Sequence, residues 1–558
     1  METLEIKDSL ARNWLAALCI CSGRCVAEAS GAAESKKWSD RFTQSVLEWL
    51  AVPEPDRLDL RNMPYGEAAN DMLLLMLRCR RSDEEAADKG ASKPSVSLQI
   101  ANDPESLYSG LVLTCLGLGD IEACDLNIKG QKNDGQQLRP FEYDARSRAA
   151  AFVISDWLDM PPQFVGTYES RIAISLEQAA DKAKLGDAGA RALESEKQRK
   201  WGWRKYLATG AGVAVAGTLV GVTAGLAAPL MVAGMGAVGI GGLGFLATTG
   251  GAAMVGSLLG VAGGGVIGRR FNTRLRGLRE FYFTQLPLQS PAPEDVHAHS
   301  LHATMFVPGF LDAAASASPF APVRDVMGLD LGDAYTLYFE TKELIALQSA
   351  FADFVRNTAK SAAVSALLTK TVLGGLLGAF AWPLAILKFG QLIDSPWSVG
   401  IERARRAGNL LADVLENHAH GTRPVTLVGY SLGALAIFTC LTELHRRKAF
   451  GIVETAVLLG MPVDSTNTSS WTACCQCVSR RIIIGYSNND WVLAFLFRAS
   501  SLCTQLAGLS GVDGSKMFAD KPLARRKLVN VDLSGIITEH SDYLGKLDDV
   551  MLEVSRFI

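Results

Sequence analysis

Short apolar runs alternate with amphipathic stretches of helical period between residues 300 and 558. The runs are rich in β-branched residues and are bounded by turn residues, so each predicts a buried strand. They cover residues 302–310, 334–340, 425–430, 455–463, 480–486 and 527–533. Residues 398–418 and 432–447 have the spacing of helices, and a further helix is expected after Asp490. This alternation predicts an α/β domain over residues 300–558, with a mainly parallel sheet and helices on both faces.

Residues 1–200 predict helices rather than strands. Apolar residues recur at helical spacing in 70–81 and 106–126, and the polar stretch 82–95 is typical of a linker. Residues 169–201 are rich in Ala, Glu, Lys and Arg, which favours a surface helix, with a short coiled coil as the alternative. The sequence therefore predicts an all-helical N-terminal domain.

Residues 206–268 contain no charged residue and many glycines. One membrane-spanning helix needs about 20 apolar residues, so this length suits two passes joined by a turn. Basic residues flank both ends, at 199–205 and 269–276, which favours a hairpin whose ends face the cytosol. A buried helical hairpin in a soluble core and a hairpin that inserts only on demand are the alternatives. Glycines that recur every fourth residue would let two helices approach closely in lipid: Gly217, Gly221, Gly225, Gly256, Gly260, Gly264 and Gly268.

A second apolar segment interrupts the α/β domain at residues 361–393. Its most apolar part, 371–387, is short for a membrane span and contains Pro383. A segment of this kind suits the membrane interface or a mobile cover over an active site.

Composition narrows the class of protein. The chain has 558 residues and a net charge of −3, from 55 Lys and Arg against 58 Asp and Glu, so no nucleic-acid partner is expected. Its 11 cysteines are odd in number and clustered, which disfavours a secreted disulfide framework. Residues 1–25 carry acidic residues and only a short apolar run, unlike a secretory signal. We therefore expect a reducing compartment, with the soluble parts in the cytosol.

The stretch Gly429-Tyr430-Ser431-Leu432-Gly433 follows a predicted strand and precedes a predicted helix. Gly-x-Ser-x-Gly in that position is the nucleophile elbow, a turn so tight that its flanking positions tolerate little side chain. The five-residue pattern alone is weak in a glycine-rich chain, and the strand and helix around it are the stronger evidence. Ser431 is the predicted nucleophile.

A serine nucleophile needs a base and an orienting acid, which follow it in the chain order Ser, acid, His. Of the seven histidines, only His540 comes late enough, because the others precede Ser431 or, as His445, lie in the helix directly after it. A surface-loop histidine is the alternative reading of His540. Asp490 follows the strand 480–486 and is the preferred acid, although a helix N-cap would also explain it. Asp464 is the rival acid.

The negative charge of a tetrahedral intermediate requires backbone N–H donors. Leu432, directly after the nucleophile, is one expected donor. The other is expected from the turn after an earlier strand, "VPGFLD" at 307–312, where Phe310 is favoured and Leu311 lies beside it. An ordinary Pro-Gly turn is the alternative.

Other clusters carry less weight. His297, His299 and His302 lack further ligands for a metal, so a solvated loop is expected. The cysteines of "CCQC" at 474–477 predict reduced thiols, with lipid attachment as the alternative. No phosphate-binding glycine loop is found. The sequence thus predicts neither a metal nor a cofactor.

Four blocks of sequence resemble the family of transmembrane and coiled-coil domain-containing protein 4: "RPVTLVGYSLGALAIFTCLTEL", "DSPWSVGIERARRAGNLLADVL", "YSNNDWVLAFLFRASS" followed by "AGL", and "NVDLSGIITEHSDY". The resemblance runs from about residue 200 to the C-terminus. It implies an α/β-hydrolase fold behind a hydrophobic membrane segment, a lipase- or esterase-like activity, and Ser431, Asp490 and His540 as its triad. No clear antiparallel strand pair precedes residue 300, so the sheet is expected to be reduced at one edge, with "FYFTQL" at 281–286 as a remnant.

Together these observations predict a serine hydrolase on an intracellular membrane that cleaves ester bonds of a lipid, with its catalytic domain facing the cytosol. The lipid ester and the membrane are its expected partners, and the helical N-terminal domain is a candidate docking surface for a protein. A non-catalytic membrane adaptor on a hydrolase scaffold is the alternative. A pore formed by the glycine-striped hairpin is a third, weaker hypothesis.

Overall fold

The computed structural model describes residues 9–50, 52–62, 143–157, 160–161, 163–170, 172–173, 278–286, 300–312, 319–327, 331–359, 397–420, 423–494, 505–519 and 522–558. The expected helices at 70–81 and 106–126, the hairpin at 206–268 and the apolar segment 361–393 lie outside these residues. The chain divides into two compact units, and of the described residues, 300–302, 420 and 423–424 belong with the N-terminal unit.

The described part of the N-terminal unit is helical, as predicted. It contains α1 (Ser9–Ser30), α2 (Ala33–Trp49), α3 (Glu54–Arg61) and α7 (Ala145–Trp157). Trp38 and Phe42 of α2 stack at 5.1 Å, and a Cβ on Gly23 of α1 would lie 2.5 Å from the Phe42 ring. The side chains of α1 and α2 therefore meet in one apolar core.

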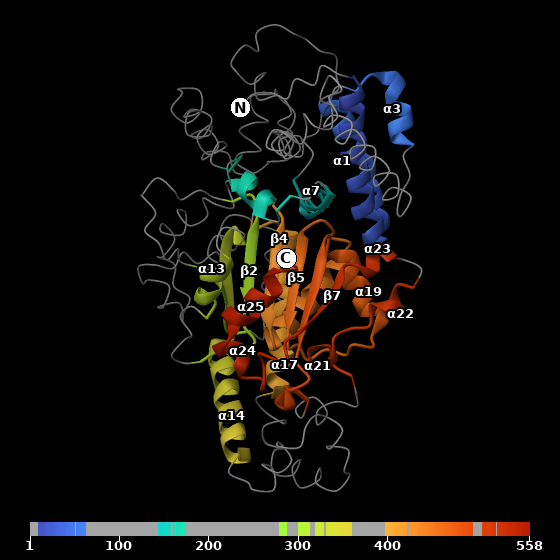
Figure 1. Ribbon diagram of the computed structural model, residues 1–558. Helices are drawn as coiled ribbons and strands as arrows, with labels where there is room; N and C mark the ends of the chain where they lie inside the picture. The colour runs from blue at the N-terminus through green and yellow to red at the C-terminus, as the bar shows by residue number, and fades with distance from the viewer. Residues whose placement is uncertain are drawn as a thin grey trace, which may run out of the picture. The chain divides into compact units, whose positions relative to one another are not determined.

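The second unit is built on one seven-stranded sheet in the order β1-β3-β2-β4-β5-β6-β7 (Figure 1). Its strands are β1 (Phe281–Gln285), β2 (Ala303–Val307), β3 (Asp333–Phe339), β4 (Val425–Tyr430), β5 (Val453–Leu459), β6 (Arg481–Tyr486) and β7 (Leu528–Asp532). All neighbours are parallel except β1, which pairs antiparallel with β3. The six strands predicted after residue 300 are confirmed, and "FYFTQL" supplies a full edge strand rather than a remnant.

The helices of this unit are α13 (Ala321–Met327), α14 (Thr341–Ala359), α17 (Ser398–Glu416), α18 (Leu432–Arg446), α19 (Thr468–Cys477), α21 (Ala507–Ser510), α22 (Gly514–Met517), α23 (Pro522–Arg525), α24 (Asp542–Gly545) and α25 (Leu547–Ser555). α25 contacts α13 and crosses the near face of the sheet in Figure 1. α18 packs on β4, β5 and α17. A Cβ on Gly408 of α17 would lie 2.3 Å from the Ala436 carbonyl oxygen, so only glycine allows this approach.

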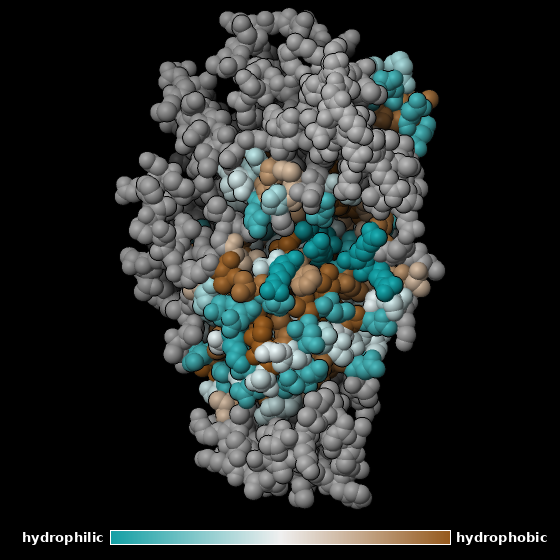
Figure 2. Space-filling view, in the orientation of Figure 1, coloured by the Kyte–Doolittle hydropathy of each residue, from teal (hydrophilic) through white to brown (hydrophobic). Residues whose placement is uncertain are grey.

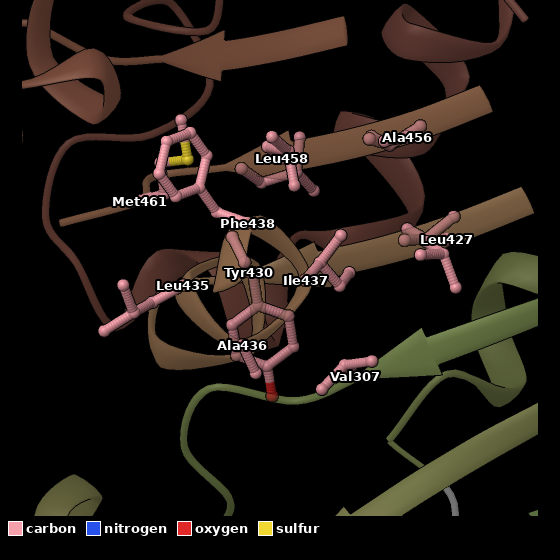
Figure 3. Packing of buried hydrophobic residues seen from close by; sticks show 14 of the residues in the cluster. Val307, Leu427, Tyr430, Leu435, Ala436, Ile437, Phe438, Ala456, Leu458 and Met461 are labelled. Carbon is pink, nitrogen blue, oxygen red and sulfur yellow. The ribbon is translucent and has the colours of Figure 1, made fainter. Parts of the chain in front are cut away.

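The core of the sheet unit lies between the strands and these helices. Figure 3 shows side chains of α18, β4 and β5 in one cluster, and Ile437 of α18 lies over Gly429 of β4, where a Cβ would be 2.7 Å from its Cδ1. On the face shown in Figure 2, hydrophilic and apolar side chains of this unit are interspersed. None of the helices in the described part of the chain has both the length and the apolar character needed to cross a membrane.

Candidate active site

Ser431 lies at a sharp turn between β4, which ends at Tyr430, and α18, which begins at Leu432. Its φ is 54° and its ψ is −123°, a left-handed conformation that costs a residue with a side chain about 1–3 kcal/mol. Glycine is required at positions 429 and 433 because a side chain would not fit at either one. A Cβ on Gly433 would lie 1.9 Å from the Val307 carbonyl oxygen, and one on Gly429 would lie 2.9 Å from the carbonyl carbon of Gly433. The turn therefore has the geometry of a nucleophile elbow.

The side chains of Ser431, His540 and Asp490 meet at the carboxyl ends of β4, β7 and β6. The Ser431 Oγ is 2.6 Å from His540 Nε2, and His540 Nδ1 is 2.6 Å from Asp490 Oδ2. All three side chains are buried. In the sequence, His540 is 50 positions from Asp490 and 109 positions from Ser431. The three residues are brought together because the carboxyl ends of neighbouring parallel strands lie at the same edge of the sheet.

Asp490 is both the partner of His540 and a helix N-cap, the two interpretations that the sequence left open. Its Oδ1 accepts a hydrogen bond of 2.9 Å from the Leu493 amide, as an N-cap does, while Oδ2 faces His540. Its rival Asp464 accepts hydrogen bonds from the amide and hydroxyl of Thr466. The partner of the imidazole is therefore Asp490.

The turn that carries Asp490 is tied to the loop that carries His540. Ser487 Oγ donates to the Ile537 carbonyl at 2.7 Å, and Asn489 Nδ2 donates to the Ser534 carbonyl at 2.9 Å. These bonds fix the distance between acid and base independently of the contact between their side chains. The polar run Ser487-Asn488-Asn489 before Asp490 was the sequence signal for this connection, and sequence reasoning missed it.

Asp542 stabilises the loop that carries His540 (the histidine loop) through hydrogen bonds to other residues of that loop. One of its oxygens, Oδ2, accepts bonds from the Thr538 amide and hydroxyl, both at 2.7 Å, from the Glu539 amide at 3.2 Å and from Lys546 Nζ at 3.0 Å. Burial raises the pKa of Asp542, but the bonds from Thr538, Lys546 and Glu539 outweigh it, so the pKa lies below its usual value. The ionised carboxylate is thus the form that this loop stabilises.

Aromatic rings surround the His540 imidazole. Their ring centroids lie at 5.4 Å for Phe310, 5.8 Å for Phe351 and 5.8 Å for Tyr543. Burial, together with the nearby Asp490 carboxyl group, raises the pKa of Tyr543 well above its usual value. Apolar surroundings of this kind exclude water and strengthen the electrostatic interactions between the three side chains.

The turn after β2 lies directly against the elbow, through Gly309. A Cβ on Gly309 would be 2.5 Å from the Leu432 amide nitrogen and 2.6 Å from Ser431 Cβ. Within the described part of the chain, the amides of Phe310 and Leu432 have no hydrogen-bond acceptor. The Leu311 amide instead donates to the Leu344 carbonyl at 3.3 Å, so Leu311 is not available as an oxyanion donor and that expectation is corrected.

His302 and the cysteines at 474–477 lie among the described residues, whereas His297 and His299 lie outside them. The solvated position expected for His302 is wrong, because His302 is buried, and burial together with Arg148 and Arg423 lowers its pKa well below the usual value. The cysteines at 474–477 are free and buried, in agreement with reduced thiols. Among the residues that the structure describes, no group of three or more His, Cys, Asp and Glu is placed to hold a metal ion.

Comparisons with known proteins identify relatives in several eukaryotes. A transmembrane and coiled-coil domain-containing protein of rice is 34% identical over 74% of this chain and 62% of its own length. An uncharacterized membrane protein of Caenorhabditis elegans is 36% identical over 62% of this chain and 54% of its own length. A probable lipase of Saccharomyces cerevisiae is 34% identical over 42% of this chain and 21% of its own length.

The chain thus spans only 62% and 54% of the length of the first two relatives. No solved structure gives a significant match. The model of one family, described as a protein of unknown function (DUF726), matches residues 200–556, which include all seven strands of the sheet and all three side chains of the candidate site. The chain is a member of the DUF726 family.

Proposed function

We propose that this protein is a membrane-associated serine hydrolase of the α/β-hydrolase class that cleaves an ester bond of a lipid. In this proposal Ser431 is the nucleophile, His540 is the general base and acid, and Asp490 orients the imidazole. The observation that carries the proposal is the pair of 2.6 Å contacts that join the three side chains. The elbow geometry of Ser431 and the mostly parallel sheet beneath it support the same class.

The geometry supports a mechanism in two halves. Ser431 Oγ attacks the ester carbonyl while His540 Nε2 takes the hydroxyl proton, and Asp490 stabilises the imidazolium through Nδ1–H. The amides of Leu432 and Phe310 donate to the oxyanion of the tetrahedral intermediate. His540 then returns its proton to the leaving alcohol, and an acyl-enzyme remains. A water molecule, deprotonated by His540, attacks the acyl group. The bond between the acyl carbon and Ser431 Oγ then breaks, His540 returns the proton to Oγ, and the carboxylic acid is released.

A lipid substrate and a membrane location have separate support. The yeast relative is named a probable lipase, and relatives in rice and the nematode carry names that place them in membranes. The sequence of residues 206–268 has the apolar length for two membrane passes. A hydrolase held at a membrane surface would meet apolar esters where they are concentrated.

Labelling with a fluorophosphonate probe tests the proposal. In the full chain, Ser431→Ala should abolish labelling and lower ester hydrolysis by about 10⁴- to 10⁶-fold, because the attacking oxygen is lost. Ser469→Ala, which removes an exposed serine of α19, should be labelled like the unmodified protein. Labelling of Ser431→Ala at the rate of the unmodified protein would reject the proposal, and would favour a scaffold without catalysis.

A further inference from the structure

Tyr430, the residue between Gly429 and the nucleophile, sends its side chain toward the turn that follows β2. The side chain is buried, and its hydroxyl donates a hydrogen bond of 2.5 Å to the Phe310 carbonyl oxygen. In Figure 3 the Tyr430 oxygen points from β4 to the green chain that continues from Val307. Tyr430, the last residue of β4, therefore contacts the backbone of the turn that carries the Phe310 amide, the second oxyanion donor of the proposed mechanism.

The hydrogen bond from Tyr430 is one of two that hold a single peptide group in place. The peptide that joins Phe310 to Leu311 is held at its carbonyl oxygen by Tyr430 and at its N–H by the Leu344 carbonyl, at 3.3 Å. A peptide group is planar, so bonds on both sides fix its orientation. The neighbouring peptide, which carries the Phe310 N–H, is confined from the other side by Gly309 against the elbow.

The ring of Tyr430 is itself rigidly placed. It lies edge-on to the Phe310 ring at 5.1 Å and tilted against the Phe320 ring at 5.7 Å. Burial raises the pKa of Tyr430, so its hydroxyl stays protonated and remains a donor across the physiological range. A rigid ring with a permanent donor gives the Phe310 carbonyl one position rather than several.

We propose that Tyr430 is a positioning residue for the oxyanion hole: its hydroxyl holds the Phe310–Leu311 peptide so that the Phe310 N–H points to the same place as the Leu432 N–H. This inference rests on the proposed serine hydrolase function and assigns Tyr430 a part in it. The Tyr430 side chain of β4 thereby sets the distance between the Leu432 N–H, at the start of α18, and the Phe310 N–H, in the turn after β2.

The test is Tyr430→Phe in the full chain, with the fluorophosphonate probe. During labelling Ser431 Oγ bonds to phosphorus, fluoride leaves, His540 takes the hydroxyl proton and the phosphoryl oxygen occupies the oxyanion site. Tyr430→Phe keeps the ring and its two ring contacts but removes the donor. We expect the second-order labelling rate to fall about 10- to 100-fold, since a misplacement of about 1 Å has effects of that size. For a soluble p-nitrophenyl ester, kcat should fall with KM unchanged.

Thr426→Val is the matched control, because it removes a buried hydroxyl from the same strand, one that bonds to Glu454 at 3.2 Å. Its labelling rate should match that of the unmodified protein, and the unfolding midpoints of both variants should be measured. An unchanged labelling rate in Tyr430→Phe overturns the inference and leaves the hydrolase proposal intact. Equal slowing in Thr426→Val, or a rise in KM without loss of kcat, also overturns it, because the effect would not be specific to the oxyanion hole. Absence of labelling in the unmodified protein overturns both proposals.

Discussion

At the scale of single residues, close contact between backbones determines the site. Ser431 adopts a left-handed conformation, and the turn after β2 meets it without an intervening side chain at Gly309. The backbone angle of Gly309 itself lies outside the left-handed region. Glycine is therefore required at position 309 because of space alone.

Gly309→Ala should consequently destabilise the protein and distort the site. Its Cβ would lie 2.1 Å from the Tyr430 carbonyl oxygen, and a backbone atom cannot move aside as a flexible side chain can. We expect a loss of about 3 kcal/mol in the free energy of unfolding, the upper end for overpacking, measured by chemical denaturation. Gly545→Ala, where nothing lies within 4 Å of the added Cβ, is the control and should be neutral or slightly stabilising. Equal stability of the two variants would contradict the close approach.

Chain order and a small number of histidines left few candidates in the sequence, and the three residues that it favoured, Ser431, Asp490 and His540, are in contact in the structure. The sequence favoured Phe310 over Leu311 as the second oxyanion donor but kept both. That choice depends on the direction of one peptide group, which is set by Leu344 and by a hydroxyl 120 residues away in the sequence. The role of Tyr430 was hidden for the same reason, since tyrosine before the nucleophile also reads as an ordinary buried strand residue.

At the scale of elements, the central strands β2 to β6 were predictable because each combines β-branched or aromatic residues with complete or nearly complete burial. β7 was predicted although Val531 is its one buried residue. β4, β5 and β3 are buried at every position. The edge strand β1 has the mixed burial pattern of a strand with one neighbour, so periodicity alone gave it little signal. The loops between strands carry the acid and the base, and their hydrogen bonds decide whether these meet.

Asp542→Asn tests the contribution of the histidine loop. The variant loses the charge that accepts bonds from Thr538, Glu539 and Lys546, so we expect a loss of about 1–2 kcal/mol in the free energy of unfolding at neutral pH. The folded pKa of Asp542 lies below its unfolded value, so its stabilisation is present above the unfolded pKa and is lost as the pH falls through the folded pKa. The difference between the two proteins should therefore narrow below about pH 4.

The control for this prediction is Asp548→Asn, which removes the same charge from an exposed position in the first turn of α25. A carboxylate there contributes only a few tenths of a kcal/mol, up to about 1. Denaturation curves of the three proteins at several pH values give the comparison. A difference that stays constant from neutral to acidic pH would show that the Asp542 charge does not hold the loop.

At the scale of the whole molecule, two kinds of sequence are joined in one chain. The described residues of the sheet unit are an ordinary mixture of charged and apolar types, and the exposed large apolar side chains among them are Val399 and Leu552. Residues 206–268 carry no charge at all. That contrast is a property of composition, so it was visible without coordinates, whereas the position of this segment in the cell requires a direct measurement.

Alkaline carbonate extraction of cell membranes supplies that measurement. If residues 206–268 cross the bilayer twice, the full chain should remain in the membrane pellet, and so should Ser431→Ala, because catalysis is not needed for insertion. The double variant Val220→Arg and Leu259→Arg places one charge in each expected pass, at a cost of about 2.5–3.5 kcal/mol for each arginine near the centre of a span, and should move to the supernatant. Leu552→Arg adds a charge where the side chain is already 54% exposed and should stay in the pellet. Release of the unmodified chain by carbonate would mean that the segment does not span the membrane, and the lipid-facing part of the proposal would then depend on surface contact alone.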